Sequence, residues 1–178
     1  MAKVTLLTHT PDPERYIAAA AKLCYSASGV DTLLDKLTDE KAAEFVEMLA
    51  SMGHESPIEH VSFTFGIEGV SRSLLAQITR HRIASFSVQS QRYVREKQFS
   101  FVTPPEIEKD PETLAIYNQA MQNAIQSYDA LADRLKERHT AELMAEGMEE
   151  KAARRQAEKM AIEDARFVLP NAADTNMI

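Results

Sequence analysis

The chain has 178 residues, of which 44% are hydrophobic, and its formal net charge is −7. This length and composition predict a single domain over residues 1–178 that buries its own core. The acidic balance argues against a general nucleic-acid surface, so we expect no nucleic-acid partner. The only cysteine, Cys24, leaves no internal disulfide, and no apolar run approaches the length of a membrane span. We therefore expect a soluble, cytoplasmic protein with no membrane partner.

The first third of the chain has the pattern of a strand followed by two helices. Residues 3–10 are rich in Val, Leu and Thr, which favours a strand. Helices are predicted over residues 13–25 and 38–53, and residues 54–60 then form a polar connector. Cys24 lies among small apolar residues near the end of the first helix, so we expect its thiol to be buried.

The middle of the chain changes its hydrophobic period. Apolar and polar residues alternate over 61–68, which predicts a strand with one buried face that ends at Gly69. The spacing then lengthens over residues 70–82 and predicts a helix. A further strand is expected over residues 93–102, before the prolines at 104–105 break it.

The last third predicts two long helices. Asp110 and Pro111 supply an N-cap and a first-turn proline for a helix of about 30 residues. Its apolar residues lie near heptad spacing, which indicates a hairpin partner or a subunit interface. A turn at Gly147 leads to a second helix over residues 149–168. Together these elements predict an α+β fold, with a small mixed or antiparallel sheet and long packed helices.

A basic segment interrupts this acidic chain. Residues 70–98 contain six Lys or Arg against one Glu, so this stretch carries about +5. Such a local concentration favours a site for a small anion, because the arginine side chain can donate two parallel hydrogen bonds to a phosphate. The serines and glutamines over 85–91 add groups that match a phosphate or the edges of a base. The alternative for residues 80–82 is a solvated helix end, where the helix dipole favours cations.

Other candidate sites are weaker. The chain has no glycine-rich phosphate loop, no cysteine pair and no His-Glu-x-x-His motif. His54 and His60 bracket a connector with two glutamates, but nothing in the spacing determines a ligand geometry, so we predict no metal site. Arg166 can pair with Glu163 or Asp164 or reach a ligand, and periodicity does not decide between these alternatives.

Three motifs carry a resemblance to a known family. Arg80-His81-Arg82, seven residues and then Ser90 resemble the Arg-His-Arg-x7-Ser signature of the flavin-dependent thymidylate synthases. Residues 53–63 resemble the family's Gly-His-Glu-[Ser/Thr]-Pro-x-Glu-His segment, and residues 165–172 resemble its Ala-Arg-x-x-Leu-Pro element. The order and rough spacing of these motifs agree with those of the family from about Leu6 to the end of the chain. The resemblance therefore implies the fold of that family.

The resemblance implies a homotetrameric enzyme that uses FAD to methylate dUMP to dTMP. Methylenetetrahydrofolate gives the carbon, and NADPH gives the hydride through the flavin. The implied flavin-binding residues are Ser56, Arg80, His81, Arg82 and Val88. The implied dUMP-binding residues are Gln77, Ile78, Thr79, Arg80, Val88, Gln89, Ser90, Gln91, Arg92 and Arg166. Catalytic roles fall to Arg80, Ser90 and Arg92.

The residues also bear on the mechanism. Cys24 lies far in sequence from every motif, which disfavours a thiolate attack on the pyrimidine. Ser90 has no evident base beside it, so we assign it to substrate contact rather than nucleophilic attack. Family members continue for some tens of residues beyond the Leu-Pro-Asn block, and we expect this chain to be either a shortened relative or a truncated form. The alternatives are a non-catalytic nucleotide- or RNA-binding module and a flavin-binding scaffold without turnover.

Overall fold

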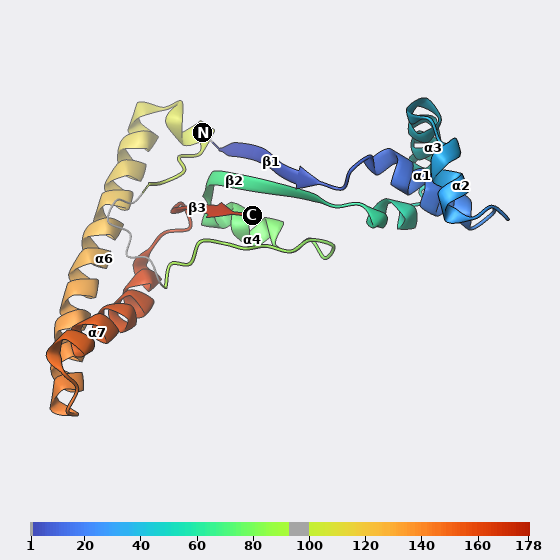
Figure 1. Ribbon diagram of the computed structural model, residues 1–178. Coiled ribbons are helices and arrows are strands. Elements are labelled where there is room, and N and C mark those ends of the chain that lie inside the picture. Colours follow the sequence, from blue (N-terminus) through green and yellow to red (C-terminus); the bar gives the residue numbers. More distant parts are fainter. Residues whose placement is uncertain (1, 93–99) are drawn as a thin grey trace. The chain divides into compact units, whose positions relative to one another are not determined.

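The computed structural model describes residues 2–92 and 100–178 (Figure 1). Contacts divide the chain into two compact units. One unit holds residues 4–66, and the other holds residues 2–3 and the described residues from Ile67 onward. Two such units can belong to one domain, so the single domain over residues 1–178 stays a prediction.

The unit of residues 4–66 contains three helices, α1 (Pro13–Leu23), α2 (Val30–Lys36) and α3 (Asp39–Ser51). The predicted helices over 13–25 and 38–53 are confirmed as α1 and α3, whereas α2 was not predicted. Small side chains let α1 and α3 approach closely, and the core contains Ala18, Ala19, Leu37 and Ala42, with Phe45 packed against them.

Local chemistry sets both ends of α3. The Thr38 hydroxyl accepts a hydrogen bond from the Lys41 backbone N–H, as an N-cap does. At the other end Gly53 has φ +70°, and the next residue, His54, donates its N–H to the Leu49 carbonyl. The predicted polar connector then forms a short 3₁₀ helix, η1 (Ser56–His60).

The sheet has three strands in the order β1-β2-β3, with β1 at Lys3–His9, β2 at Phe63–Ser71 and β3 at Asp174–Met177. Strands β2 and β3 are antiparallel, and their register is irregular between Ile67 and Val70. Gly69 lies in this irregularity with φ +67°. The prediction that Gly69 ends the strand is therefore wrong: the glycine supports a bulge, and the strand continues to Ser71.

The prediction that one face of β2 is buried is also wrong for its aromatic residues. Phe63 is 50% exposed and Phe65 is 42% exposed. Alternation shows that apolar side chains share a face, but it does not show that the chain itself covers that face.

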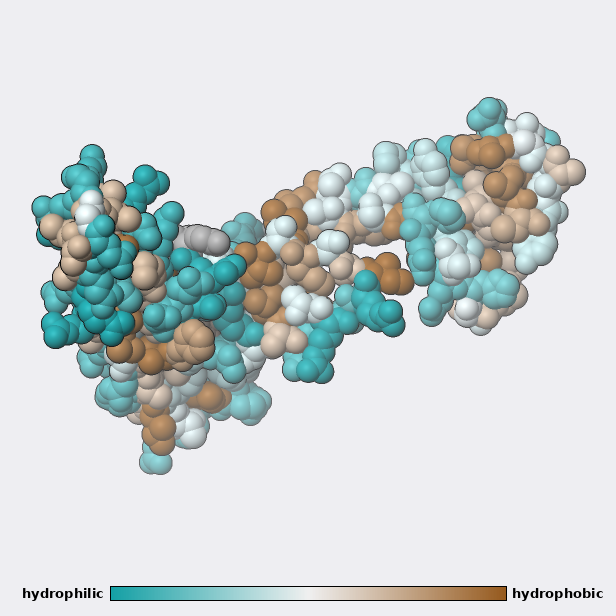
Figure 2. All heavy atoms as spheres, turned by 90° about the horizontal axis from the view of Figure 1, so that it is seen from below, coloured by the Kyte–Doolittle hydropathy of each residue, from teal (hydrophilic) through white to brown (hydrophobic). Residues whose placement is uncertain are grey.

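A helix hairpin forms most of the remaining structure (Figure 1). Helix α6 (Pro111–Ala145, 35 residues) confirms the predicted long helix, and α7 (Glu150–Ala165) is the hairpin partner. The interface buries Tyr128 and Ala132 against Ala165, and Leu143 against Ala153 and Ala157. Figure 2 shows a largely hydrophilic outer surface over this pair. Of the helices in the described ranges, none combines the length and the apolar character that a bilayer crossing requires.

The shorter elements depart from the predicted pattern. Helix α4 (Arg72–Ile78) is shorter than the expected 70–82 at both ends, because residues 70–71 belong to β2 and a turn begins at Thr79. The predicted last helix, 149–168, ends as the 3₁₀ turn η2 (Arg166–Val168), and helix α5 (Pro105–Glu108) was not predicted. Of the strand expected over 93–102, residues 93–99 lie outside the described residues, and Phe101 forms an antiparallel bridge with Ala173. The α+β class itself is confirmed.

Candidate functional site

The basic motif begins just after α4. The Ser71 hydroxyl caps the start of this helix by accepting a hydrogen bond from the Leu74 N–H at 3.1 Å. The helix ends at Ile78, and the backbone N–H of Arg80 donates to the Gln77 carbonyl at 3.2 Å. The motif therefore lies in a turn beyond the helix end, with Gln77, Ile78 and Thr79 on the preceding helical turn.

Arg80, His81 and Arg82 present three donor side chains to solvent. All three residues are exposed, and in the described part of the chain their side chains form neither an ion pair nor a hydrogen bond. Two arginines are permanently charged, and an exposed imidazole adds a further donor or acceptor. The turn is therefore suited to an anionic group with several acceptor oxygens.

The chain then returns along the sheet. Ser87 and Ile178 exchange two backbone hydrogen bonds, of 2.8 and 2.9 Å, and Val88 forms an antiparallel bridge with Met177. The Gln89 N–H donates to the Asn176 carbonyl at 3.0 Å. These residues extend the hydrogen-bonded ladder beyond β3, which places Val88 and Gln89 on a supported backbone.

Two residues that the motif analysis missed hold Gln89. The Arg72 guanidinium donates to the Gln89 carbonyl oxygen at 2.8 Å, and the Asn176 side-chain amide donates to Gln89 Oε1 at 3.3 Å. Arg72 belongs to the basic segment, but its sequence position gives no sign of this contact. Asn176 is 87 residues from Gln89, so local pattern analysis has no signal for it.

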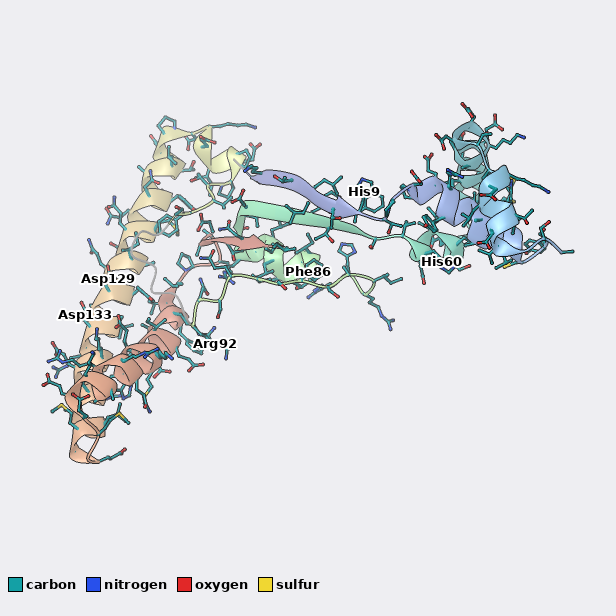
Figure 3. The ribbon with its side chains drawn as sticks, in the orientation of Figure 1. His9, His60, Phe86, Arg92, Asp129 and Asp133 are labelled. Atoms are coloured by element: carbon teal, nitrogen blue, oxygen red, sulfur yellow. The ribbon has the colours of Figure 1, made fainter. Side chains whose placement is uncertain are left out.

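The far end of the segment meets the end of α7 (Figure 3). The Arg92 guanidinium lies 3.6 Å from the Glu163 carboxylate, and Arg166 Nε donates to the Glu163 carbonyl at 3.0 Å. Of the expected partners Glu163 and Asp164, Arg166 therefore contacts Glu163, but through its backbone carbonyl. The Glu163 carboxylate pairs with Arg92 instead. Two predicted site residues, Arg92 and Arg166, are thus brought together.

Ser90 and Gln91 lie in the turn before Arg92. The Ser90 hydroxyl accepts a hydrogen bond from the Arg92 N–H at 3.2 Å. No carboxylate or imidazole among the described residues is hydrogen-bonded to this hydroxyl. Nor does a hydrogen bond or ion pair join the Arg80–Arg82 side chains to residues 89–92 in the described ranges.

Ser56 belongs to the other unit and lines a cavity there. The cavity has a volume of about 560 Å³ and is lined largely by apolar side chains, with Cys24, His54 and Ser56 among its polar groups. Cys24 is exposed, so the prediction of a buried thiol is wrong: the residue is the C-cap of α1 and lines the open cavity instead of the core. In the described residues, no three His, Cys, Asp or Glu side chains are grouped as metal ligands would be.

Solved structures share this fold. A UMP/dUMP methylase, PolB, from Streptomyces cacaoi bound with 5-Br dUMP is similar with a TM-score of 0.68 and 18% identity, over 99% of this chain and 71% of that one. Thymidylate Synthase X from Helicobacter pylori with FAD and dUMP is similar with a TM-score of 0.62 and 21% identity, over 99% and 76% of the two chains. At these identities the similarity establishes the fold alone.

Sequence comparison establishes the family. Residues 5–178 match the family described as thymidylate synthase complementing protein. The flavin-dependent thymidylate synthase of Clostridium tetani is 54% identical over 99% of this chain and 68% of that protein, and the one of Geobacter sulfurreducens is 42% identical over 99% and 66%. The chain therefore belongs to the thymidylate synthase complementing protein family, and it spans about two thirds of the length of these relatives.

Proposed function

We propose that this protein is a flavin-dependent thymidylate synthase that methylates dUMP to dTMP. Methylenetetrahydrofolate is the carbon donor and NADPH the reductant. The observation that carries the proposal is the junction at Glu163, which brings Arg92 of the first motif block and Arg166 of the last one together. The names of the relatives, at up to 54% identity in those given above, support the same reaction.

The basic turn fits the flavin cofactor. FAD carries a pyrophosphate, and Arg80, His81 and Arg82, whose side chains have no partner among the described residues, are the donors that such a group requires. Ser56 and Val88 are the other proposed flavin contacts. Bound there, FAD would supply the hydride chemistry that no side chain of this chain supplies.

The segment after the turn fits the nucleotide. The proposed dUMP contacts are Gln77, Ile78, Thr79, Arg80, Val88, Gln89, Ser90, Gln91, Arg92 and Arg166. Of these, Arg80 and Arg92 stabilise negative charge that builds up on the uracil carbonyls, which activates C5 towards the one-carbon donor. Ser90 contacts the substrate and is not a nucleophile, because no base among the described residues is bonded to its hydroxyl, which accepts from the Arg92 N–H.

We also place this reaction in a homotetramer whose sites are shared between subunits. The exposed aromatic residues of β2, Phe63 and Phe65, support association because large apolar side chains in water favour a partner surface. The exposed, unpaired thiol of Cys24 fits a cytoplasmic location, where thiols stay reduced.

The test is a reaction with the purified protein. Its absorption spectrum should show the flavin bands after FAD is added. Anaerobic reduction with NADPH, followed by dUMP and methylenetetrahydrofolate, should then yield dTMP. A protein that stays colourless and retains no FAD contradicts the proposal. A protein that retains FAD but forms no dTMP contradicts the catalytic part and supports a scaffold without turnover.

A further inference from the structure

Gln89 is held at three polar groups by two residues outside the motif. Its carbonyl oxygen accepts from Arg72 Nη2 at 2.8 Å, and its N–H donates to the Asn176 carbonyl at 3.0 Å. Its side-chain oxygen accepts from Asn176 Nδ2 at 3.3 Å. Two of these bonds hold the Gln89 backbone and the third holds its side chain, so the residue loses rotamer freedom that an exposed side chain ordinarily keeps.

The hydrogen bonds also determine which way each amide faces. Asn176 Oδ1 accepts from the Gly69 backbone N–H at 3.2 Å, and a backbone N–H can donate only to an oxygen. Asn176 must therefore direct its Nδ2 group at Gln89, as observed. Because Gln89 accepts with Oε1, its Nε2 carries two hydrogens that bond to no other described residue and are available to a ligand.

The geometry points to Asn176 as the positioning residue that orients the Gln89 carboxamide toward a carbonyl oxygen of the pyrimidine, with Arg72 holding the Gln89 backbone in place. Uracil presents carbonyl acceptors, which the Nε2 group complements, whereas a reversed carboxamide would present an oxygen to them. The inference rests on the proposed function, because it takes dUMP as the ligand of Gln89. The bulge at Gly69 contributes to this positioning, because the Gly69 N–H determines the orientation of the Asn176 side chain.

The substitution Asn176→Asp tests the positioning role. The aspartate still accepts from Gly69, but it has no N–H for Gln89 Oε1, so the Gln89 carboxamide must reverse and turn Nε2 toward the aspartate. We expect dUMP to bind about tenfold more weakly to the FAD-loaded protein in calorimetric titration, the loss of about one hydrogen bond. FAD retention and the melting temperature should stay unchanged. Asn123→Asp on α6 is the control, because it adds the same charge where the side chain already accepts from Gln119.

A second substitution distinguishes an effect on the orientation of the Gln89 carboxamide from a general loss of order around the site. In a Gln89→Ala background, Asn176→Asp should have no further effect on dUMP affinity, because both changes act through one side chain. If the same weakening persists there, the positioning role is wrong. Asn176→Ser removes the Nδ2 donor without a new charge and serves if the aspartate variant does not fold. Arg72→Lys, which keeps the charge but loses the planar guanidinium, should weaken dUMP binding several-fold.

The outcomes distinguish this inference from the proposed function. If the unsubstituted protein holds FAD but binds no dUMP, the proposed function and the positioning role are both wrong. A starting protein that binds dUMP, with Asn176→Asp and Arg72→Lys binding it equally well, overturns the positioning role alone.

Discussion

Arg82 and Arg92, near the two ends of the basic motif over residues 80–92, have different electrostatic environments. Arg82 is exposed and has no ion pair in the described ranges, whereas Arg92 already lies 3.6 Å from the Glu163 carboxylate. An anion that approaches Arg82 has no carboxylate to displace there. The ion pair at Arg92 is half exposed, so it contributes little to folding and can yield to a substrate. The two ends therefore suit a resident cofactor and an exchanging substrate, respectively.

The substitution Arg82→Ala should weaken FAD retention and leave folding intact. An exposed side chain without a partner contributes little to stability, so the free energy of unfolding should change by less than about 0.5 kcal/mol. Loss of a charge-assisted hydrogen bond should lower FAD affinity about tenfold or more. Flavin fluorescence after gel filtration measures retention, and thermal denaturation of the flavin-free protein measures stability.

The control for this substitution is Arg155→Ala on α7. Arg155 is also exposed, also lacks an ion pair within the described residues, and lies outside the motifs. It should retain FAD as the starting protein does. Equal losses of FAD retention and of stability in Arg82→Ala would assign Arg82 a structural role instead.

At the scale of the elements, α6 depends on its N-cap. The Asp110 carboxylate accepts a hydrogen bond from the Thr113 N–H at 3.0 Å, and this bond, with a second one to the Thr113 side chain, lowers the pKa of Asp110. A carboxyl whose pKa is lower in the folded state stabilises that state above its unfolded pKa of about 4. This contribution is lost as the pH falls through the folded value.

Asp110→Asn should separate this titration from the other acidic groups. Asparagine also caps helices, but it does not titrate, so the difference in melting temperature between the two proteins should be constant above about pH 5 and should change below about pH 4. Differential scanning calorimetry from pH 3 to 7 measures it. A difference that stays constant through pH 3 would show that Asp110 does not contribute through its charge.

The turn between α6 and α7 depends on one glycine. Gly147 has φ +96°, a conformation that L side chains rarely adopt, and the open space around it contains no atom that a methyl group would meet. Gly147→Ala should therefore destabilise the protein through backbone strain alone, by about 1 kcal/mol. Chemical denaturation measures the change.

Gly29→Ala is the matched control for this strain. Gly29, the N-cap of α2, has the same open surroundings but an ordinary φ of −70°, so alanine causes no backbone strain there. Alanine is a poorer N-cap than glycine but lowers the entropy of the unfolded chain, and these opposed effects should leave a net change of only a few tenths of a kcal/mol. Equal losses of stability in Gly29→Ala and Gly147→Ala would show that the positive φ at Gly147 is not the cause of the destabilisation.

Local chemistry explains which elements were predictable from sequence. The caps at Thr38 and Asp110 and the apolar periods of α1, α3 and α6 lie within a few residues of the structure they determine. Strand β3 was not predicted, because it is only four residues long and two of them, Asp174 and Asn176, are weak strand formers. It forms through backbone hydrogen bonds to distant segments, β2 on one side and residues 87–89 on the other.

The candidate site is likewise divided into features with a local sequence signal and features formed by distant residues. The basic turn was apparent from composition and motif, whereas the contacts of Arg92 with Glu163 and of Gln89 with Asn176 join residues about 70 and 87 positions apart. A single sequence has no local signal for such pairs.

At the scale of the whole molecule, one face of the β1–β2 pair is unusually apolar for a surface. Leu7 lies 3.5 Å from the position that a Cβ of Gly66 would occupy, so these two residues share a face. Alternation along both strands then places the other apolar side chains on the opposite face. The most exposed of those residues are Val4, Leu6, Phe63 and Phe65, which are 63%, 48%, 50% and 42% exposed.

A charge on this apolar face should break up the proposed homotetramer. Phe65→Glu places a carboxylate among Val4, Leu6 and Phe63, and burial of that charge against a second subunit costs several kcal/mol. The starting protein should have the mass of four chains by multi-angle light scattering, and the variant a smaller mass at the same concentration. Gln122→Glu adds the same charge at an exposed polar position of α6 and should leave the mass unchanged. A Phe65→Glu protein that keeps the full mass would show that this face is not a subunit interface, because a carboxylate without a partner is not tolerated in a closely packed apolar contact.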